Sequence, residues 1–352
     1  MNKNTDKYDN TMLKNCIRVI VILIVVFTII YSDRSPKRSS IYKTPDKSVS
    51  SESSGLNAVT ISDIPQEVSS SPKDDTSSET ASSNQENTDK KFLHLLISNS
   101  RIHTGNLVLV DENNQCRTDG QNYTELSAEA NNYYHIGEVG LLLNQDIISP
   151  LNKMMHAFYN NTSNDSLTVT NGYISYDRQL KLYNDENNSS ATNDAYTEKP
   201  GYSEHQIGNT FDLSILDGNT QTLSHYTPYG DYRWITDNCY KFGFIVSYEN
   251  NKSDITGKEY CPWHFRYVGT AHATIMKYNN FCLKEYIEYV RRFTYSKQHL
   301  TLTDADMNNW EIYYVPADLK NADDETEVVV PRNSEYYISG DNSKGFIVSV
   351  KK

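Results

Sequence analysis

The sequence has little that would bind nucleic acid and little that would build a thiolate metal site. Its 352 residues include 33 Lys and Arg against 45 Asp and Glu, so the net charge is -12. An acidic chain repels phosphate backbones, and no stretch of the folded region clusters Lys or Arg, so we expect no nucleic-acid partner. The five cysteines form no CxxC pair, which excludes a thiolate zinc ribbon and a thioredoxin-type motif. They are Cys16, Cys116, Cys239, Cys261 and Cys282.

The chain also lacks a long apolar run. Residues 19–31, VIVILIVVFTIIY, form a run of 13, whereas a helix that spans a bilayer needs about 20 residues. Lys14 and Arg18 precede this run and can snorkel, which would lengthen a span. The residues after it, 31–34, offer no small-x-small cleavage site, which favours an uncleaved anchor over a cleaved signal peptide. We therefore expect residues 1–32 to form a cytoplasmic tail and a single-pass membrane anchor.

Residues 33–90 are poor in aromatic side chains. They hold sixteen Ser and one aromatic residue, Tyr42. Such a segment cannot bury enough apolar surface to offset the entropy cost of ordering, so the sequence predicts a disordered linker over residues 33–91. A flexible spacer of this length would hold a folded domain away from a membrane, within reach of a cell wall.

Folded sequence is expected from Phe92 onward, as an α+β main domain over residues 92–299. Its expected strands, from apolar alternation, are 107–110, 167–170, 210–215, 244–248 and 263–268. Its expected helices, from apolar residues near helical spacing, are 136–159, 175–183, 232–242 and 270–293. Short strands at 312–315, 328–330 and 346–350 predict a small β appendage over residues 300–352. The appendage either caps the main domain or binds a ligand, and we favour capping.

Two segments of the main domain contain a set of metal-ligating residues. His205 and Asp212 lie seven residues apart, and a turn at Gly208 that leads into a strand would let them converge. A second segment supplies His264. Two imidazoles and a carboxylate suit zinc and leave a fourth position for water, as catalytic zinc sites require. The other histidines, such as His225 and His272, are interpreted as structural.

The same two segments resemble a known family. Residues 203–214, SEHQIGNTFDLS, match the motif SxHxxGxxxD, and residues 262–269, PWHFRYVG, match the end of the ExWH motif. Both motifs belong to the VanY-type zinc D-Ala-D-Ala carboxypeptidases, relatives of the LAS metallopeptidases, and the resemblance spans roughly residues 95–292.

This resemblance implies a small antiparallel sheet with flanking helices. It also implies that Zn²⁺ is held by His205, Asp212 and His264. Further candidates for binding the substrate follow from the same resemblance: Ser203, Tyr173, Gln179 and Trp263.

Three positions depart from the family pattern. Cys261 occupies the position of the Glu that exchanges a proton with water and the leaving amine, and a thiol with a pKa of about 8.5 is a poor replacement. Ile174 replaces an Arg that resembles a clamp for the substrate carboxylate or for the transition state, and isoleucine offers neither charge nor donor. Ser247 replaces another Arg. Glu259, two residues before Cys261, is a possible substitute base if a bulge at Pro262 brings it closer.

Other interpretations of these departures stay open. Glu204 adjoins a ligand but should point away from the metal, so it is a weaker candidate for the base than Glu259. Cys261 could itself complete a closed, structural zinc site, could pair with Cys239 or Cys282, or could be a free thiol. All three weaken the catalytic interpretation.

The function that the sequence favours is an enzyme, with activity weakened by the departures at Cys261 and Ile174. The resemblance implies a membrane-anchored zinc carboxypeptidase, with its folded domain on the cell-wall side of a bacterial membrane, that hydrolyses the D-Ala-D-Ala end of peptidoglycan stem peptides. The alternative is a pseudoenzyme that binds wall peptides or a protein partner without cutting. A third hypothesis is a purely structural zinc, with function in the appendage or linker.

Overall fold

The computed structural model describes residues 91–118, 122–188 and 197–352. The predicted anchor, and the predicted linker up to residue 90, lie outside these ranges. Within the described ranges, no helix is both long enough and apolar enough to cross a membrane.

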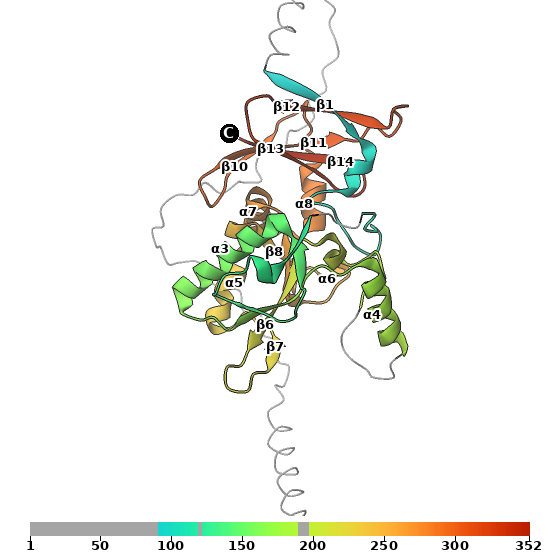
Figure 1. Ribbon diagram of the computed structural model, residues 1–352. Coiled ribbons are helices and arrows are strands. Elements are labelled where there is room, and N and C mark those ends of the chain that lie inside the picture. The colour runs from blue at the N-terminus through green and yellow to red at the C-terminus, as the bar shows by residue number, and fades with distance from the viewer. Residues whose placement is uncertain (1–90, 119–121, 189–196) are drawn as a thin grey trace, which may run out of the picture. The chain divides into compact units, whose positions relative to one another are not determined.

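Helices and strands alternate irregularly along the chain (Figure 1). The α-helices are α3 (Gln145–Thr162), α4 (Tyr176–Asn188), α5 (Arg233–Asn238), α6 (Ser253–Thr256), α7 (Thr270–Asn279) and α8 (Leu283–Val290). The 3-10 turns are η1 (Asn99–His103), η2 (Leu126–Ala128), η3 (Glu204–Ile207), η4 (Gly230–Tyr232) and η5 (Cys239–Phe242).

The strands fall into two groups along the chain. The earlier ones are β1 (Phe92–Ser98), β2 (Tyr123–Glu125), β3 (His135–Ile136), β4 (Leu142–Asn144), β5 (Leu167–Asn171), β6 (Thr210–Leu216), β7 (Leu223–His225), β8 (Phe244–Tyr248) and β9 (Cys261–Tyr267). The later ones are β10 (Leu300–Thr303), β11 (Asn309–Pro316), β12 (Glu325–Pro331), β13 (Tyr336–Gly340) and β14 (Gly345–Lys351).

The central sheet has the strand order β3-β5-β6-β9-β8, with β7 paired to β6. Its neighbours are antiparallel except for β3 and β5, so the predicted α+β class is confirmed. One face of the sheet buries Phe211 and Phe265, whose rings stack with centroids 5.8 Å apart. Helix α3 packs into the same apolar cluster through its buried side chains, among them Leu151 and Phe158. Because side chains alternate along a strand, Asp212 and His264 face the other way.

The C-terminal strands form a four-stranded sheet in the order β10-β11-β14-β13. Its strands share an apolar cluster with α7 and α8, in which Ile312 and Ile347 pack beside Tyr286. This shared core favours the capping interpretation of the appendage. Two hydrogen bonds from His272 cross the same boundary, to the Tyr286 hydroxyl at 2.6 Å and the Ser349 hydroxyl at 2.9 Å. His272 is therefore structural, as expected.

The appendage contains more of the chain than residues 300–352. Strand β1, at the start of the folded sequence, pairs with β12 and with no other named strand among the described residues (Figure 1, cyan beside orange). Ile97 and Ile102 pack with Val328 and Val348 in the same buried cluster. The expected boundaries at residues 92 and 300 therefore differ from the structure, because the first strand of the predicted main domain belongs to the C-terminal β unit.

Several expected elements begin or end elsewhere. The helix expected over residues 136–159 starts only at α3, where the Asn144 side chain accepts a hydrogen bond from the Asp146 N–H. The helix expected over 270–293 is interrupted at Asn280, which adopts the left-handed conformation with φ 54° and ends α7. The helix expected over 232–242 is α5 followed by η5, and it stops at Gly243 as predicted.

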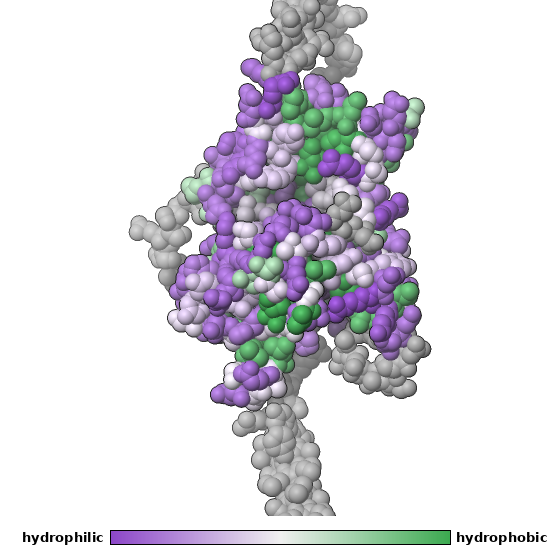
Figure 2. Space-filling view, viewed as in Figure 1, coloured by the Kyte–Doolittle hydropathy of each residue, from purple (hydrophilic) through white to green (hydrophobic). Residues whose placement is uncertain are grey.

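The strand expected over residues 107–110 is not formed. Its apolar side chains, Leu107, Val108 and Val110, are nonetheless buried. The Leu107 N–H donates to the Ser339 hydroxyl rather than to a neighbouring strand. On the face drawn in Figure 2, hydrophilic side chains predominate and hydrophobic ones form separate patches. The larger apolar clusters consist of buried residues.

Candidate metal centre

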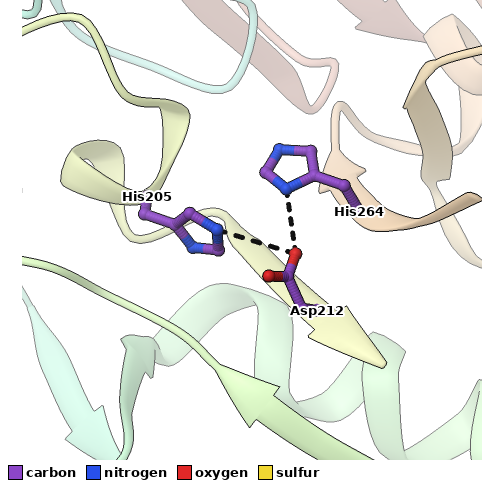
Figure 3. Close-up of side chains that lie close together, drawn as sticks. All are labelled: His205, Asp212 and His264. Atoms are coloured by element: carbon purple, nitrogen blue, oxygen red, sulfur yellow. Dashed lines mark hydrogen bonds and ion pairs between the residues drawn. The ribbon is translucent and has the colours of Figure 1, made fainter. Parts of the chain in front are cut away.

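The structure brings together the three residues expected to bind zinc. His205 lies in η3, Asp212 on β6 and His264 on β9, directly opposite Asp212 in the strand register. The Asp212 Oδ1 atom lies 2.9 Å from His264 Nδ1 and 3.6 Å from His205 Nε2 (Figure 3). One potential ligand atom from each residue lies within 4.8 Å of the others, and all three residues are buried.

The turn at Gly208 is what allows His205 and Asp212 to converge. Gly208 ends η3 with φ 79°, a left-handed conformation that L side chains rarely adopt. A Cβ atom there would also lie 2.3 Å from the Tyr123 ring. Glycine is required at this position on both counts, as the sequence pattern suggested.

Each ligand keeps one atom for a metal because a neighbour occupies the other. The Gly172 carbonyl accepts a hydrogen bond from His205 Nδ1 at 2.8 Å, which leaves His205 Nε2 as the unprotonated nitrogen. The Asn171 side chain donates to Asp212 Oδ2 at 2.8 Å, which leaves Oδ1 facing the two histidines. These supporting contacts are what metal-binding His and Asp residues require.

His264 is oriented by a buried carboxylate. Its Nε2 atom lies 3.1 Å from Glu204 Oε2, so its Nδ1 atom faces Asp212. Glu204 is held in turn by the Ser247 hydroxyl at 2.7 Å and by Arg266 Nη1 at 2.9 Å. Arg266 is fully buried, and its Nη2 atom donates to the carbonyls of Asn106 and Val108.

Glu204 is not one of the convergent ligand residues, but its carboxylate contacts the ligand His264, and this makes it a positioning residue. The sequence predicts neither this contact with His264 nor the role of Arg266. Glu204 adjoins His205 in sequence but contacts a histidine 60 positions later. The spacing of the residues therefore holds no signal that could have revealed the contact.

The charges around His264 favour a bound cation. Burial would lower the pKa of His264, but hydrogen bonds to Asp212 and Glu204 raise it to about 10. Burial would raise the pKa of Glu204, but the Arg266 charge and the His264 hydrogen bond lower it to about 2. Burial is likewise outweighed at Asp212, where His205 and His264 hold the pKa well below its usual range. A divalent cation would replace the His264 proton between these carboxylates, so the residues present fit zinc.

Cys261 lies beside the cluster but is not part of it. A bulge in the β8–β9 pairing, between Val246 opposite Phe265 and Tyr248 opposite Cys261, sets the direction of this end of β9. Neither Cys261 nor Glu259 joins the convergent ligand atoms that the described residues provide. Glu259 is exposed and precedes the strand.

The Cys261 thiol is a poor base where it lies. Burial and the negative charges of Asp212 and Glu198 raise its pKa to about 11, so it keeps its proton at neutral pH. Cys261, Cys239 and Cys282 are all free thiols, which speaks against a disulfide between Cys261 and either of the other two.

The residues expected to bind substrate have different surroundings. Ser203 is buried immediately before η3. Tyr173 stacks on Tyr123 with ring centroids 4.0 Å apart. Gln179 is buried and donates to the Glu198 carbonyl at 2.8 Å. The Trp263 ring lies 4.7 Å from that of His225.

Comparison with known proteins places this site in a family. The VanY profile, described as D-alanyl-D-alanine carboxypeptidase, matches residues 140–270, which contain all three ligands. A D-alanyl-D-alanine carboxypeptidase of Enterococcus faecium is 32% identical over 275 residues, which cover 76% of this chain and 81% of that protein. The chain belongs to the VanY family. The predicted resemblance is thereby confirmed.

Other VanY relatives agree with this placement. The putative carboxypeptidase YodJ of Bacillus subtilis is 39% identical over 128 residues, 36% of this chain and 47% of that protein. A solved structure of the vancomycin resistance D,D-dipeptidase VanXYg, in complex with a D-Ala-D-Ala phosphinate analogue, superposes with a TM-score of 0.64. It is 26% identical and covers 74% of this chain and 99% of its own.

Proposed function

We propose that this VanY-family protein is a zinc carboxypeptidase that removes the terminal D-Ala from peptidoglycan stem peptides. The observation that carries the proposal is the convergence of His205 Nε2, Asp212 Oδ1 and His264 Nδ1, each left facing the others by a specific partner. Three protein ligands leave an open coordination position, which is the arrangement of catalytic rather than structural zinc sites.

Different residues of the chain bind the metal ion and orient its ligands. Zinc, when bound, would activate water and polarise the scissile carbonyl. His205, Asp212 and His264 hold the ion, while Asn171 and Glu204 fix the orientation of their side chains. Cys261 keeps its proton at neutral pH and so cannot accept one from water. We therefore propose a slow enzyme, whose proton transfer lacks the usual carboxylate.

Release of D-Ala from a muramyl pentapeptide tests this function. The full chain loaded with zinc is expected to release D-Ala, measured by chromatography, at a rate that falls to background after chelation. A His205→Ala variant is expected to lose the same activity, because a two-ligand site binds zinc weakly. If the wild type releases no more D-Ala than this variant, the carboxypeptidase proposal is wrong.

A second function is favoured by two residues, Cys261 and Ile174. The first cannot serve as a base at neutral pH, and the second is a buried apolar side chain. A protein with the zinc ligands but without these groups would bind stem peptides and not cut them. Titration calorimetry with the same pentapeptide distinguishes the cases, since this alternative requires binding without any release of D-Ala.

We also propose that residues 1–32 anchor the protein in the bacterial cell membrane, with the catalytic domain on the cell-wall side. The support is the apolar run of residues 19–31 and the Ser-rich sequence that follows it. In cells that express the full chain, the protein is expected in the membrane fraction, and protease added to protoplasts should digest its folded domain. Recovery in the soluble fraction would contradict the proposal.

A further inference from the structure

An ion pair joins the two segments that supply the metal ligands. Lys258 Nζ lies 3.0 Å from Glu198 Oε1, and the two side chains are 17% and 24% exposed. Glu198 precedes the ligand His205 by seven residues, and Lys258 precedes the ligand His264 by six. The pair therefore lies where solvent still reaches it, between the two segments of the site.

The backbone on both sides of this ion pair is held in place. Gln179, which is buried, donates a hydrogen bond to the Glu198 carbonyl at 2.8 Å. The Lys258 N–H donates to the Thr256 hydroxyl at 3.3 Å, and that hydroxyl donates back to the Lys258 carbonyl at 3.4 Å. The backbone at both residues is therefore held by contacts other than the ion pair itself.

The ion pair lies near Cys261, at the start of β9, the strand that carries the ligand His264. The charges of Glu198 and Lys258 act on the Cys261 thiol, together with that of the ligand Asp212. Cys261 is paired across the sheet with Tyr248, whose ring stacks on that of His264 at a centroid distance of 5.0 Å. A peptide whose scissile carbonyl reaches the metal carries its free carboxylate one residue further on.

A peptide that ends in a free carboxylate needs a cation to receive it. The Arg266 charge acts on Glu204 and Tyr248, and the Lys258 charge acts on Cys261. The Arg266 side chain is fully enclosed, and Glu204 and two carbonyls occupy its Nη atoms. A lysine ammonium on a flexible stem can exchange one carboxylate for another without breaking buried hydrogen bonds of this kind.

We propose that Lys258 is the specificity-determining cation that binds the C-terminal carboxylate of the substrate, and that Glu198 is its partner while the site is empty. The inference rests on the proposed function, since it says which residue of that enzyme recognises the free carboxylate of its substrate. Binding replaces the Glu198 carboxylate by that of the peptide, so Glu198 competes with the substrate. Lys258 therefore raises the affinity for the substrate, and Glu198 lowers it.

Titration calorimetry on the zinc-loaded full chain tests this, with D-alanyl-D-alanine and its C-terminal amide as probes. Lys258→Met is expected to weaken binding of the free dipeptide by about tenfold or more, the usual loss for one charged hydrogen bond. Glu198→Gln is expected to tighten it by about two- to tenfold, because an exposed competitor is removed. Neither change should alter binding of the amide.

Lys241→Met is the matched control, since Lys241 is an exposed lysine that lies over the Tyr240 ring, 5.8 Å from its centroid. It should bind both probes as the wild type does, and zinc content should be equal in all variants. Equal weakening by Lys258→Met and Glu198→Gln would show a merely structural ion pair and overturn the inference. Unchanged binding by Lys258→Met would overturn it too, with the proposed function intact, whereas absence of binding by the wild type would overturn both.

Discussion

Replacing Cys261 with glutamate is expected to raise kcat/KM for D-Ala release by about 10²–10⁴-fold, the usual contribution of a positioned general base. Cys261 is half-buried beside Asp212, and burial holds its thiol pKa near 11, so the wild-type side chain cannot take a proton at neutral pH. The same surroundings would raise the pKa of a glutamate too, but from an ordinary value of about 4.3, so a glutamate there would still be largely ionised at neutral pH.

The control for this change is Cys261→Gln, which has the shape of the glutamate without its charge. Both variants should bind zinc as the wild type does, because Cys261 contributes no atom to the convergent ligand cluster. Steady-state rates on a muramyl pentapeptide then isolate the proton transfer. Equal rates for Cys261→Glu and Cys261→Gln would show that the missing base does not limit the reaction.

Replacing Glu204 with alanine is expected to lower the free energy of unfolding by about 3–5 kcal/mol, the range for breaking a buried ion pair from one side. The variant would leave the fully buried Arg266 without its carboxylate and would remove the partner of His264 Nε2. Denaturant unfolding of the metal-free protein measures the change.

Two milder variants separate stability from metal binding. Ser247→Ala removes one hydrogen bond to Glu204 and should cost about 1 kcal/mol. Glu204→Gln keeps the shape but not the charge, and it should weaken zinc affinity about 10–100-fold, as expected for the loss of a partner that orients a ligand. Wild-type zinc affinity in Glu204→Gln would contradict the positioning role of this carboxylate.

The ligand set could be predicted from the sequence because its geometry is largely local. His205, Gly208 and Asp212 lie within one turn and one strand, and the motif fixes their spacing. The supporting residues could not be predicted, because they depend on contacts between distant segments. Arg266 reaches the carbonyls of Asn106 and Val108, about 160 residues earlier.

The same difference between local patterns and long-range contacts decides which parts of the fold the sequence predicts. The strands at 167–170, 210–215 and 244–248 carry their apolar signal within a few residues and are formed as predicted. Two helix ends differ from the expected ones because a single polar residue decides them, Asn144 before α3 and Asn280 after α7. The pairing of β1 with β12 leaves no trace in either segment alone.

That pairing has a consequence for how the protein folds. The side chains of His94 and Glu327, which form a hydrogen bond across β1 and β12, are separated by 233 positions. Strand β1 is made early during synthesis but must wait for nearly the whole folded sequence before its partner exists. Closing so long a loop is slow, and an unpaired strand edge is prone to associate with other chains in the meantime. The central sheet can form earlier, so the last step should be closure of the ribbon that joins the two ends of the folded chain.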